Sequence, residues 1–220
     1  MATAARPLRV RRTQEERSAL TQARLLDATV ECLAEVGYAR MTTTAVGRRA
    51  GLSRGAHLHH FGTKLELVTR AVQHLHERQI AEFRQAMASL PPSQGRHEAA
   101  IDVQWDIVDN SASFAAWLEL VVASRTDPDL RAIMSSLDHQ FMESARATFA
   151  ELFPDEAGTE FAALAPLFTF VVLDGLAVRR IVSSDEGEVA AVLNALKAIA
   201  QLMKPTGSSE EGRDLAHPTA

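Results

Sequence analysis

Residues 42–64 read TTTAVGRRAGLSRGAHLHHFGTK, and this stretch decides the fold of the first part of the chain. We expect a short helix over 42–50, a turn at Gly51 and a second short helix over 53–60. Two short helices joined by a tight glycine turn are typical of the helix-turn-helix unit, which places its second helix in the major groove of DNA. Small residues at Gly47 and Ala50 allow the two helices to cross closely.

Basic residues are concentrated around this stretch. Residues 1–64 carry eleven Lys and Arg against five Asp and Glu, a net charge of +6, whereas the remaining residues carry twelve against twenty-three, a net charge of −11. The overall charge of −5 conceals this division. A cationic end on an anionic body indicates that a polyanion such as DNA is bound at one end only.

The composition is that of an ordinary globular chain. Its 220 residues are 46% hydrophobic and 23% charged, which excludes wholesale disorder. Cys32 has no second cysteine to pair with, and no apolar signal segment precedes the basic residues at the start. The most apolar stretch, 161–173, contains Pro166 and is short of the roughly 20 residues that cross a bilayer. We therefore expect a cytoplasmic protein without a membrane span.

Apolar residues recur at helical spacing along nearly the whole chain, and no stretch alternates as a β-strand does. Leu26, Val30 and Leu33 show this pattern in the first helix, and Gly37 ends it. The predicted helices, about nine in all, cover 13–37, 42–50, 53–60, 63–90, 94–109, 111–126, 128–153, 156–182 and 185–204. The fold class is therefore all-α.

Helix starts are marked by capping residues. Residues 13–16, 63–66 and 183–186 each match the capping box, in which a hydroxyl and a carboxylate bind free backbone N–H groups of the first turn. Asp127 followed by Pro128 predicts another start, because proline is tolerated at the first helical position.

Residues 51–67 (GLSRGAHLHHFGTKLEL) resemble the helix-turn-helix of TetR-type transcriptional repressors, in the arrangement G-[VL]-S-[RK]-G-[TA]-x-x-x-H-F-x-[ST]-K-x-x-L. Residues 36–43 (VGYARMTT) are similar to the family's entry into its second helix. The resemblance spans residues 15–70, and beyond them only the helical layout and the length agree. It implies a three-helix DNA-binding domain on a helical ligand-binding domain, with a dimer formed by the last two long helices of each chain.

The predicted organisation follows from this resemblance. A basic arm at 1–12 precedes a helix-turn-helix domain at 13–62, and a ligand-binding and dimerisation domain occupies 63–204. The arm and the tail at 205–220 lack apolar periodicity, so we expect both to be disordered. Arg6, Arg9, Arg11 and Arg12 of the arm are either a solvated tail or a segment that enters a narrow minor groove.

The resemblance also implies the DNA contacts. Hydroxyls at a helix N-terminus suit phosphate, although helix capping alone also explains the three threonines. Arg54 can bind guanine or a phosphate. The chain has His57 then Leu58 where the family has an apolar residue and then a tyrosine, so either His57 or His59 faces the bases. The candidate DNA-binding residues are Thr42, Thr43, Thr44, Ser53, Arg54, Gly55, Ala56, His57, His59, His60 and Lys64.

Bulky apolar side chains in the second domain are either core or the lining of an effector pocket. The candidate effector-binding residues are Trp105, Trp117, Phe141 and Phe168. The last two helices either form the dimer interface or belong to the intrachain core. Their apolar residues are Leu173, Leu176, Ile181, Val189, Leu193, Leu196, Ile199 and Leu202.

Two patterns point to other chemistry and are rejected. Residues 51–55 match the G-x-S-x-G nucleophile turn, but the residues before them are too polar for the buried strand that this turn requires. Histidine is a common metal ligand, and the chain has five candidates in His57, His59, His60, His74 and His76. Adjacent histidines on a helix, however, point about 100° apart. We expect no enzyme activity, no metal and no cofactor.

The resemblance therefore implies a homodimeric repressor that binds a palindromic operator and is released by a small apolar effector. In this hypothesis the effector tilts the helix over 63–90, which links both domains. The tilt moves the two helix-turn-helix domains of the dimer out of register with the two halves of the operator. The alternative is a helical scaffold whose basic end docks an acidic protein.

Overall fold

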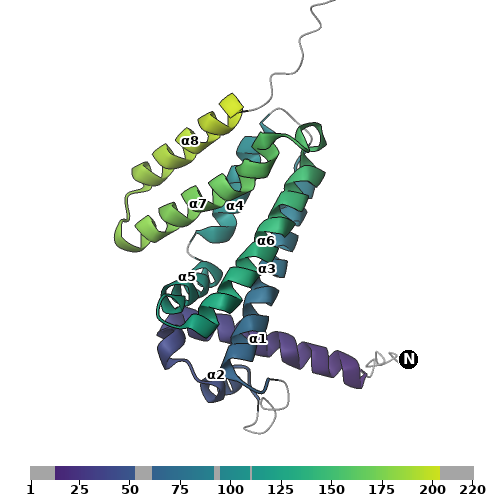
Figure 1. The fold of residues 1–220 in the computed structure, drawn as a ribbon, viewed down its shortest axis with the longest axis vertical. Helices are drawn as coiled ribbons and strands as arrows, with labels where there is room; N and C mark the ends of the chain where they lie inside the picture. The colour runs from purple at the N-terminus through teal and green to yellow at the C-terminus, as the bar shows by residue number, and fades with distance from the viewer. Residues whose placement is uncertain (1–12, 53–60, 92–94, 110, 204–220) are drawn as a thin grey trace, which may run out of the picture. The chain divides into compact units, whose positions relative to one another are not determined.

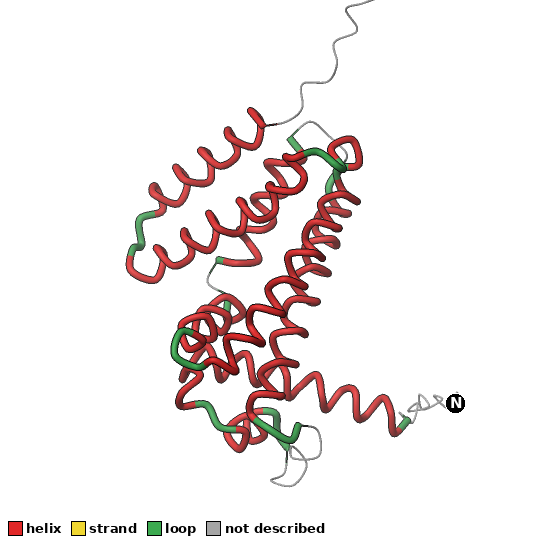
Figure 2. Tube along the Cα trace, viewed as in Figure 1, coloured by secondary structure: helices red, strands yellow, loops and turns green. Residues whose placement is uncertain are grey.

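The computed structural model describes residues 13–52, 61–91, 95–109 and 111–203. Within these ranges every regular element is helical, which confirms the all-α fold class (Figures 1 and 2). The helices are α1 (Gln14–Arg40), α2 (Thr43–Arg49), α3 (Lys64–Ser89), α4 (Arg96–Val108), α5 (Ala112–Ser124), α6 (Pro128–Leu152), the 3₁₀ turn η2 (Pro154–Glu156), α7 (Glu160–Val182) and α8 (Glu186–Met203). The helix predicted over 53–60, the arm and the tail lie outside the described residues.

Several helix starts form as their local sequences predict. Thr13 accepts the Glu16 N–H at 3.1 Å while the Glu16 carboxylate accepts the Thr13 N–H at 2.8 Å, which confirms the first capping box. The Asp127 carboxylate accepts the Leu130 N–H at 3.0 Å at the start of α6. These starts are predictable because cap and helix are neighbours in the chain.

Two other starts differ from the prediction. The Thr63 hydroxyl accepts the Glu66 N–H at 3.0 Å, but Glu66 returns its carboxylate to the Gly62 N–H at 2.9 Å instead of to Thr63. The box at 183–186 is wrong. There the Asp185 carboxylate accepts the N–H groups of residues 187 and 188 at 2.8 and 3.4 Å, because a carboxylate next to the first turn is itself a strong N-cap.

Helix α7 also begins later than predicted, at Glu160 instead of near residue 156. The η2 turn occupies 154–156, and Gly158 then takes a positive φ of 85°, so the chain leaves helical geometry before Thr159 caps α7. Thr159 accepts the Ala162 N–H at 3.1 Å.

Gly37 interrupts the first helix as expected, but one further turn follows it to Arg40. Its φ of 76° lies in the left-handed region that side chains disfavour. A Cβ at this position would lie 2.6 Å from Oε2 of Glu119, a residue of α5. The backbone conformation therefore requires glycine here, and the end of the exposed Glu119 side chain lies against it.

The chain divides into two compact units. The first contains residues up to 83 together with 107–141, and the second contains 84–106 together with the residues from 142 onward. In the first unit α1 packs against α5 and α2. Its fully buried side chains include Leu25, Leu33, Val46, Val68 and Leu120.

In the second unit α7 packs against α8, and Leu173 and Leu196 are buried. His97 of α4 binds Glu156 at 2.8 Å and stacks on Phe153 with 4.1 Å between ring centroids. This pair attaches the start of α4 to the connection between α6 and α7.

Helix α7 is longer and more apolar than the stretch 161–173 suggested. It has 23 residues, a window of mean hydropathy 2.1 and about one third of that window buried, so by length and composition it could cross a membrane. The stretch 161–173 was too short an estimate because the apolar run resumes after Asp174 and continues to Val178, before Arg179 and Arg180. Such a helix also occurs in the core of soluble proteins.

His76 is a buried titratable group of the first unit. It is 8% exposed, and its ring centroid lies 4.4 Å from that of Phe141. Burial lowers the pKa of His76 to about 4, because the charged imidazolium is poorly solvated in the core.

We expect the free energy of unfolding to fall as the pH drops from about 6.5 towards 4, since only the unfolded chain then protonates His76. The fully developed loss is about 3 kcal/mol for a shift of this size. Urea unfolding at pH 7 and pH 4.5 measures it. His76→Phe should remove this part of the pH dependence, whereas the exposed control His139→Gln should retain it. An unchanged pH dependence in His76→Phe would contradict the assignment.

Candidate nucleic-acid interface

The threonine run forms the start of α2. Thr42 is the N-cap, and its hydroxyl accepts the Ala45 N–H at 3.2 Å. Thr42 and Thr44 are exposed, while Thr43 is half-buried. A hydroxyl that accepts one bond still carries its own O–H donor, so capping and phosphate binding are compatible at Thr42.

Helix α2 is attached to α1 by both apolar and ionic contacts. Val46 and Gly47 are buried on its inner side. The Arg49 guanidinium donates to Glu31 at 3.1 Å and also binds Glu35, whose pKa it lowers. Arg49 therefore anchors α2 to α1, a role that local sequence patterns do not reveal because its partners are 14 and 18 positions away.

The turn after α2 has the geometry that the sequence predicts. Gly51 has a φ of 72°, which glycine adopts without strain, and a Cβ there would meet nothing within 4 Å. Leu52, directly after the turn residue Gly51, is half-buried, and Phe61 is buried. Seven of the candidate DNA-binding residues lie outside the described residues, namely Ser53, Arg54, Gly55, Ala56, His57, His59 and His60.

Lys64 is the first residue of α3 and is fixed to the end of α1. Its Nζ donates to the Tyr38 carbonyl at 2.5 Å and lies 4.2 Å from the centre of the Tyr38 ring. Partial burial lowers the pKa of Lys64. Because an ammonium has three donors, this attachment leaves the group able to bind a phosphate oxygen as well.

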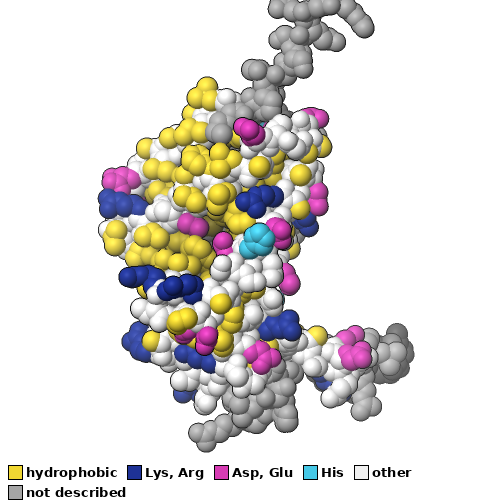
Figure 3. All heavy atoms as spheres, viewed as in Figure 1, with side chains coloured by type: hydrophobic (Ala, Val, Ile, Leu, Met, Phe, Trp, Pro, Cys, Tyr) yellow, Lys and Arg dark blue, Asp and Glu magenta, His cyan; other side chains and the backbone are white. Residues whose placement is uncertain are grey.

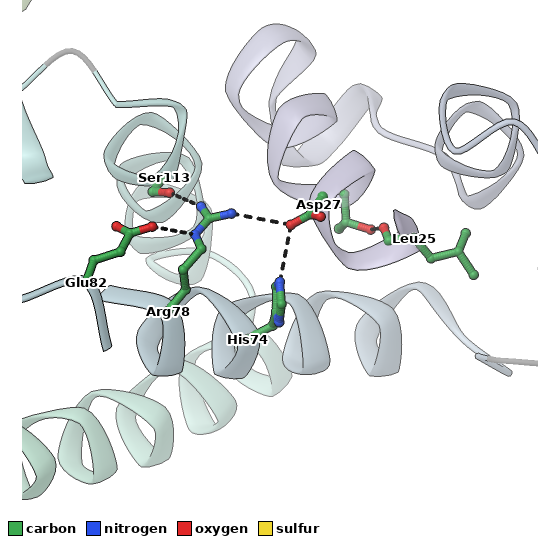
Figure 4. A network of polar contacts seen from close by, with 7 residues as sticks. Leu25, Asp27, His74, Arg78, Glu82 and Ser113 are labelled. Carbon is green, nitrogen blue, oxygen red and sulfur yellow. Dashed lines mark hydrogen bonds and ion pairs between the residues drawn. The ribbon is translucent and has the colours of Figure 1, made fainter. Parts of the chain in front are cut away.

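A polar network connects α1, α3 and α5 in the same unit (Figure 4). Asp27 of α1 accepts from His74 at 3.2 Å and from Arg78 at 3.3 Å, both on α3. Arg78 also donates to the Ser113 hydroxyl of α5 at 2.7 Å. No local sequence pattern predicts this network, because the residues that bond to one another in it are 35 to 51 positions apart.

The effector candidates are divided between the two units. Trp117 and Phe141 belong to the first, and Trp105 and Phe168 belong to the second. Trp117 lies in an apolar junction of α1, α3 and α5, with its ring 6.0 Å from that of Phe114. Trp105 is buried, and Phe168 is half-buried.

The apolar residues of the predicted dimer interface have two different environments. Leu173, Leu176, Val189 and Leu196 are buried within the chain, and Leu193 is half-buried. Ile181, Ile199 and Leu202 are exposed. Among the described residues, no group of three or more His, Cys, Asp or Glu side chains is arranged to hold a metal ion.

Comparison with known proteins agrees with this architecture. Residues 25–71 match the family model of bacterial regulatory proteins of the tetR family, and residues 99–203 match that of the BetI-type transcriptional repressor C-terminal region. An HTH-type transcriptional regulator of Mycobacterium tuberculosis is 35% identical over 174 residues, which cover 77% of this chain and 87% of that protein. CymR of Pseudomonas putida is 39% identical over 127 residues, covering 55% and 59% of the two chains.

Solved structures share the fold at low sequence identity. A TetR-family transcriptional regulator from a Rhodococcus species superposes with a TM-score of 0.67 at 15% identity, covering 84% of this chain and 98% of that one. The FadR regulator of Bacillus subtilis, solved in complex with stearoyl-CoA, has a TM-score of 0.61 at 15% identity and covers 81% and 96% of the chains.

These matches decide between the classes of function that the sequence left open. They identify a DNA-binding regulator with a helix-turn-helix and not an enzyme. The chain belongs to the TetR family of transcriptional regulators.

Proposed function

We propose that the protein is a cytoplasmic repressor that binds a palindromic operator as a homodimer and is released by a small apolar effector. The observation that carries the proposal is an exposed apolar surface on α7 and α8. Of twelve exposed large hydrophobic side chains among the described residues, nine lie on these two helices. They are Leu164, Leu167, Val171, Val178, Ile181, Val182, Val192, Ile199 and Leu202, here called the α7–α8 apolar surface.

The spacing of this surface fits a helix–helix interface. On α7, residues 164, 167, 171, 175, 178 and 182 recur every three or four positions and share one face. Gly175 is the small member of this row, and a Cβ there would meet nothing within 4 Å. Figure 3 shows apolar side chains gathered over this part of the molecule. A second copy of the chain, presenting the same two helices, would cover both surfaces at once.

A dimer of this kind has two reading heads related by a two-fold axis, and its operator is then a palindrome. We propose that residues 13–62 form the head and that residues 63–204 carry effector binding and dimerisation. The three threonines at 42–44, His60 and Lys64 bind phosphates. Arg54, Gly55, Ala56 and either His57 or His59 meet the bases, and Ser53 begins their helix.

The effector proposal rests on the apolar interior of the helical domain. A fold relative, FadR of Bacillus subtilis, was solved with stearoyl-CoA. We infer that this chain also binds a small molecule with an apolar body, against Trp105, Trp117, Phe141 or Phe168. The effector releases DNA only to the extent that it binds the DNA-free arrangement more tightly than the DNA-bound one.

Selection of bound sequences from a random duplex pool tests the operator proposal. The enriched sequence should be palindromic, and scrambling one half should weaken binding at least about tenfold. Enrichment of a single, asymmetric half-site with no such loss would contradict the two-fold arrangement.

The dimer proposal predicts different effects for two valine substitutions of equal chemistry. Val171 on α7 is 62% exposed and Val122 on α5 is 52% exposed. Val171→Asp should turn the dimer into a monomer at micromolar concentration, because it places a charge in each copy of an apolar interface. Val122→Asp should remain dimeric. Sedimentation equilibrium reports both, and a dimeric Val171→Asp would place the interface elsewhere.

The phosphate assignment of Lys64 predicts the salt dependence of binding. Lys64→Ala should weaken all operator sequences alike and lower the slope of log K against log salt by about one per head. The matched control is Lys197→Ala on α8, which removes the ion-pair partner of Asp102 on α4. It should leave the slope unchanged. A change in base preference for Lys64→Ala would show that Lys64 reads bases instead.

A further inference from the structure

Helix α5 lies along α1 through an apolar junction. Val30 and Leu33 of α1 meet Ala116, Trp117 and Leu120 of α5, and Ala71, Val72 and Leu75 of α3 complete the lining. Apolar packing holds surfaces together, but it is non-directional and fixes sliding or rotation only weakly. The polar contacts at the two ends of the junction therefore decide how α5 is set against α1.

Arg78 makes the polar contact at one end. Its guanidinium binds Asp27 of α1 at 3.3 Å and Ser113 of α5 at 2.7 Å, and its Nε lies 3.6 Å from Glu82 on its own helix (Figure 4). Ser113 is 8% exposed, so the contact reaches the buried side of α5. A planar guanidinium with fixed donor directions can hold two helices in one orientation, which a lysine ammonium does not.

Glu119 makes the polar contact at the other end. Its carboxylate accepts the Tyr38 N–H at 3.3 Å and lies against Gly37. The Tyr38 carbonyl accepts from Lys64. Two peptide-group bonds of Tyr38 thus connect α5 to the first residue of α3, which we have proposed as a phosphate ligand.

We propose that the unit which reads the operator includes α5, and that Arg78 and Glu119 are the positioning residues that set α5 against the head. The head and α5 then move as one body, and any change transmitted to α5 reaches Tyr38 and Lys64 directly. This inference rests on the proposed palindromic operator, since the orientation of α5 against the head would control the spacing between the two heads of the dimer.

The experiment measures tolerance to half-site spacing. Operators are built from the selected palindrome with the central spacer unchanged or altered by one or two base pairs. A rigid reading unit should lose at least about tenfold in affinity when one base pair is added or removed. In Arg78→Ala and Glu119→Ala the loss should shrink to about threefold or less, because a loosened head adapts to the altered spacing. A purely stabilising role would lower the melting temperature without changing this ratio.

Matched variants separate positioning from general damage. Glu119→Gln keeps an oxygen that accepts the Tyr38 N–H, and it should restore the strict spacing preference. Arg84 lies on the same helix as Arg78 and forms an ion pair with Glu151 of α6. Arg84→Ala removes this pair and should leave the spacing preference as in the wild type. Arg78→Lys keeps the charge but not the guanidinium geometry, and it should behave like Arg78→Ala.

Two results would have different meanings. A folded Arg78→Ala or Glu119→Ala with the wild-type spacing preference would overturn this inference and leave the proposed function intact. A wild-type protein without any spacing preference would instead contradict the two-fold operator. If Arg78→Ala fails to fold, the comparison of Glu119→Ala with Glu119→Gln still decides the question.

Discussion

The rest of the first unit depends on the packing of α1 against α5 and α3. This junction buries side chains of three helices that are far apart in sequence, and it supplies the non-directional part of the stability. Helix α2 has only seven residues, too few to be stable alone, so it keeps its place because Val46 is buried and Arg49 is bound to α1. The position of α2 is therefore determined by its contacts with α1, and α1 is in turn held by its packing against α5.

The two ends of the chain carry net charges of opposite sign. Acidic residues exceed basic ones after residue 64, so the body repels a phosphate backbone while the head attracts it. Within the head, however, the guanidinium of Arg49 is engaged internally with Glu31 and Glu35. The basic residues of the head are thus not equivalent as candidate phosphate contacts.

Local features of the fold could be predicted from the sequence, and long-range ones could not. The caps at Thr13, Thr42 and Asp127 depend on neighbours three positions away, so the residue types suffice. The start of α7 was misplaced because Gly158 and the η2 turn compete with a helical pattern. The contact of Glu119 with Gly37 joins residues 82 positions apart, and Gly37 was predictable only as a helix end. The identity of its neighbour depends on tertiary packing.

Helix α7 shows why composition alone misleads. One side of it packs inside the chain through Leu173 and Leu176, while Leu164, Val171 and Val182 on other positions are exposed. A helix that is apolar on both sides resembles a membrane-spanning helix in its sequence, although burial of each side against a protein surface accounts for the same composition. If a second chain covers the exposed side, the stability of each subunit becomes linked to protein concentration, since the partner binds only the folded form. Dimerisation would then contribute to folding as well as to the spacing of the two heads.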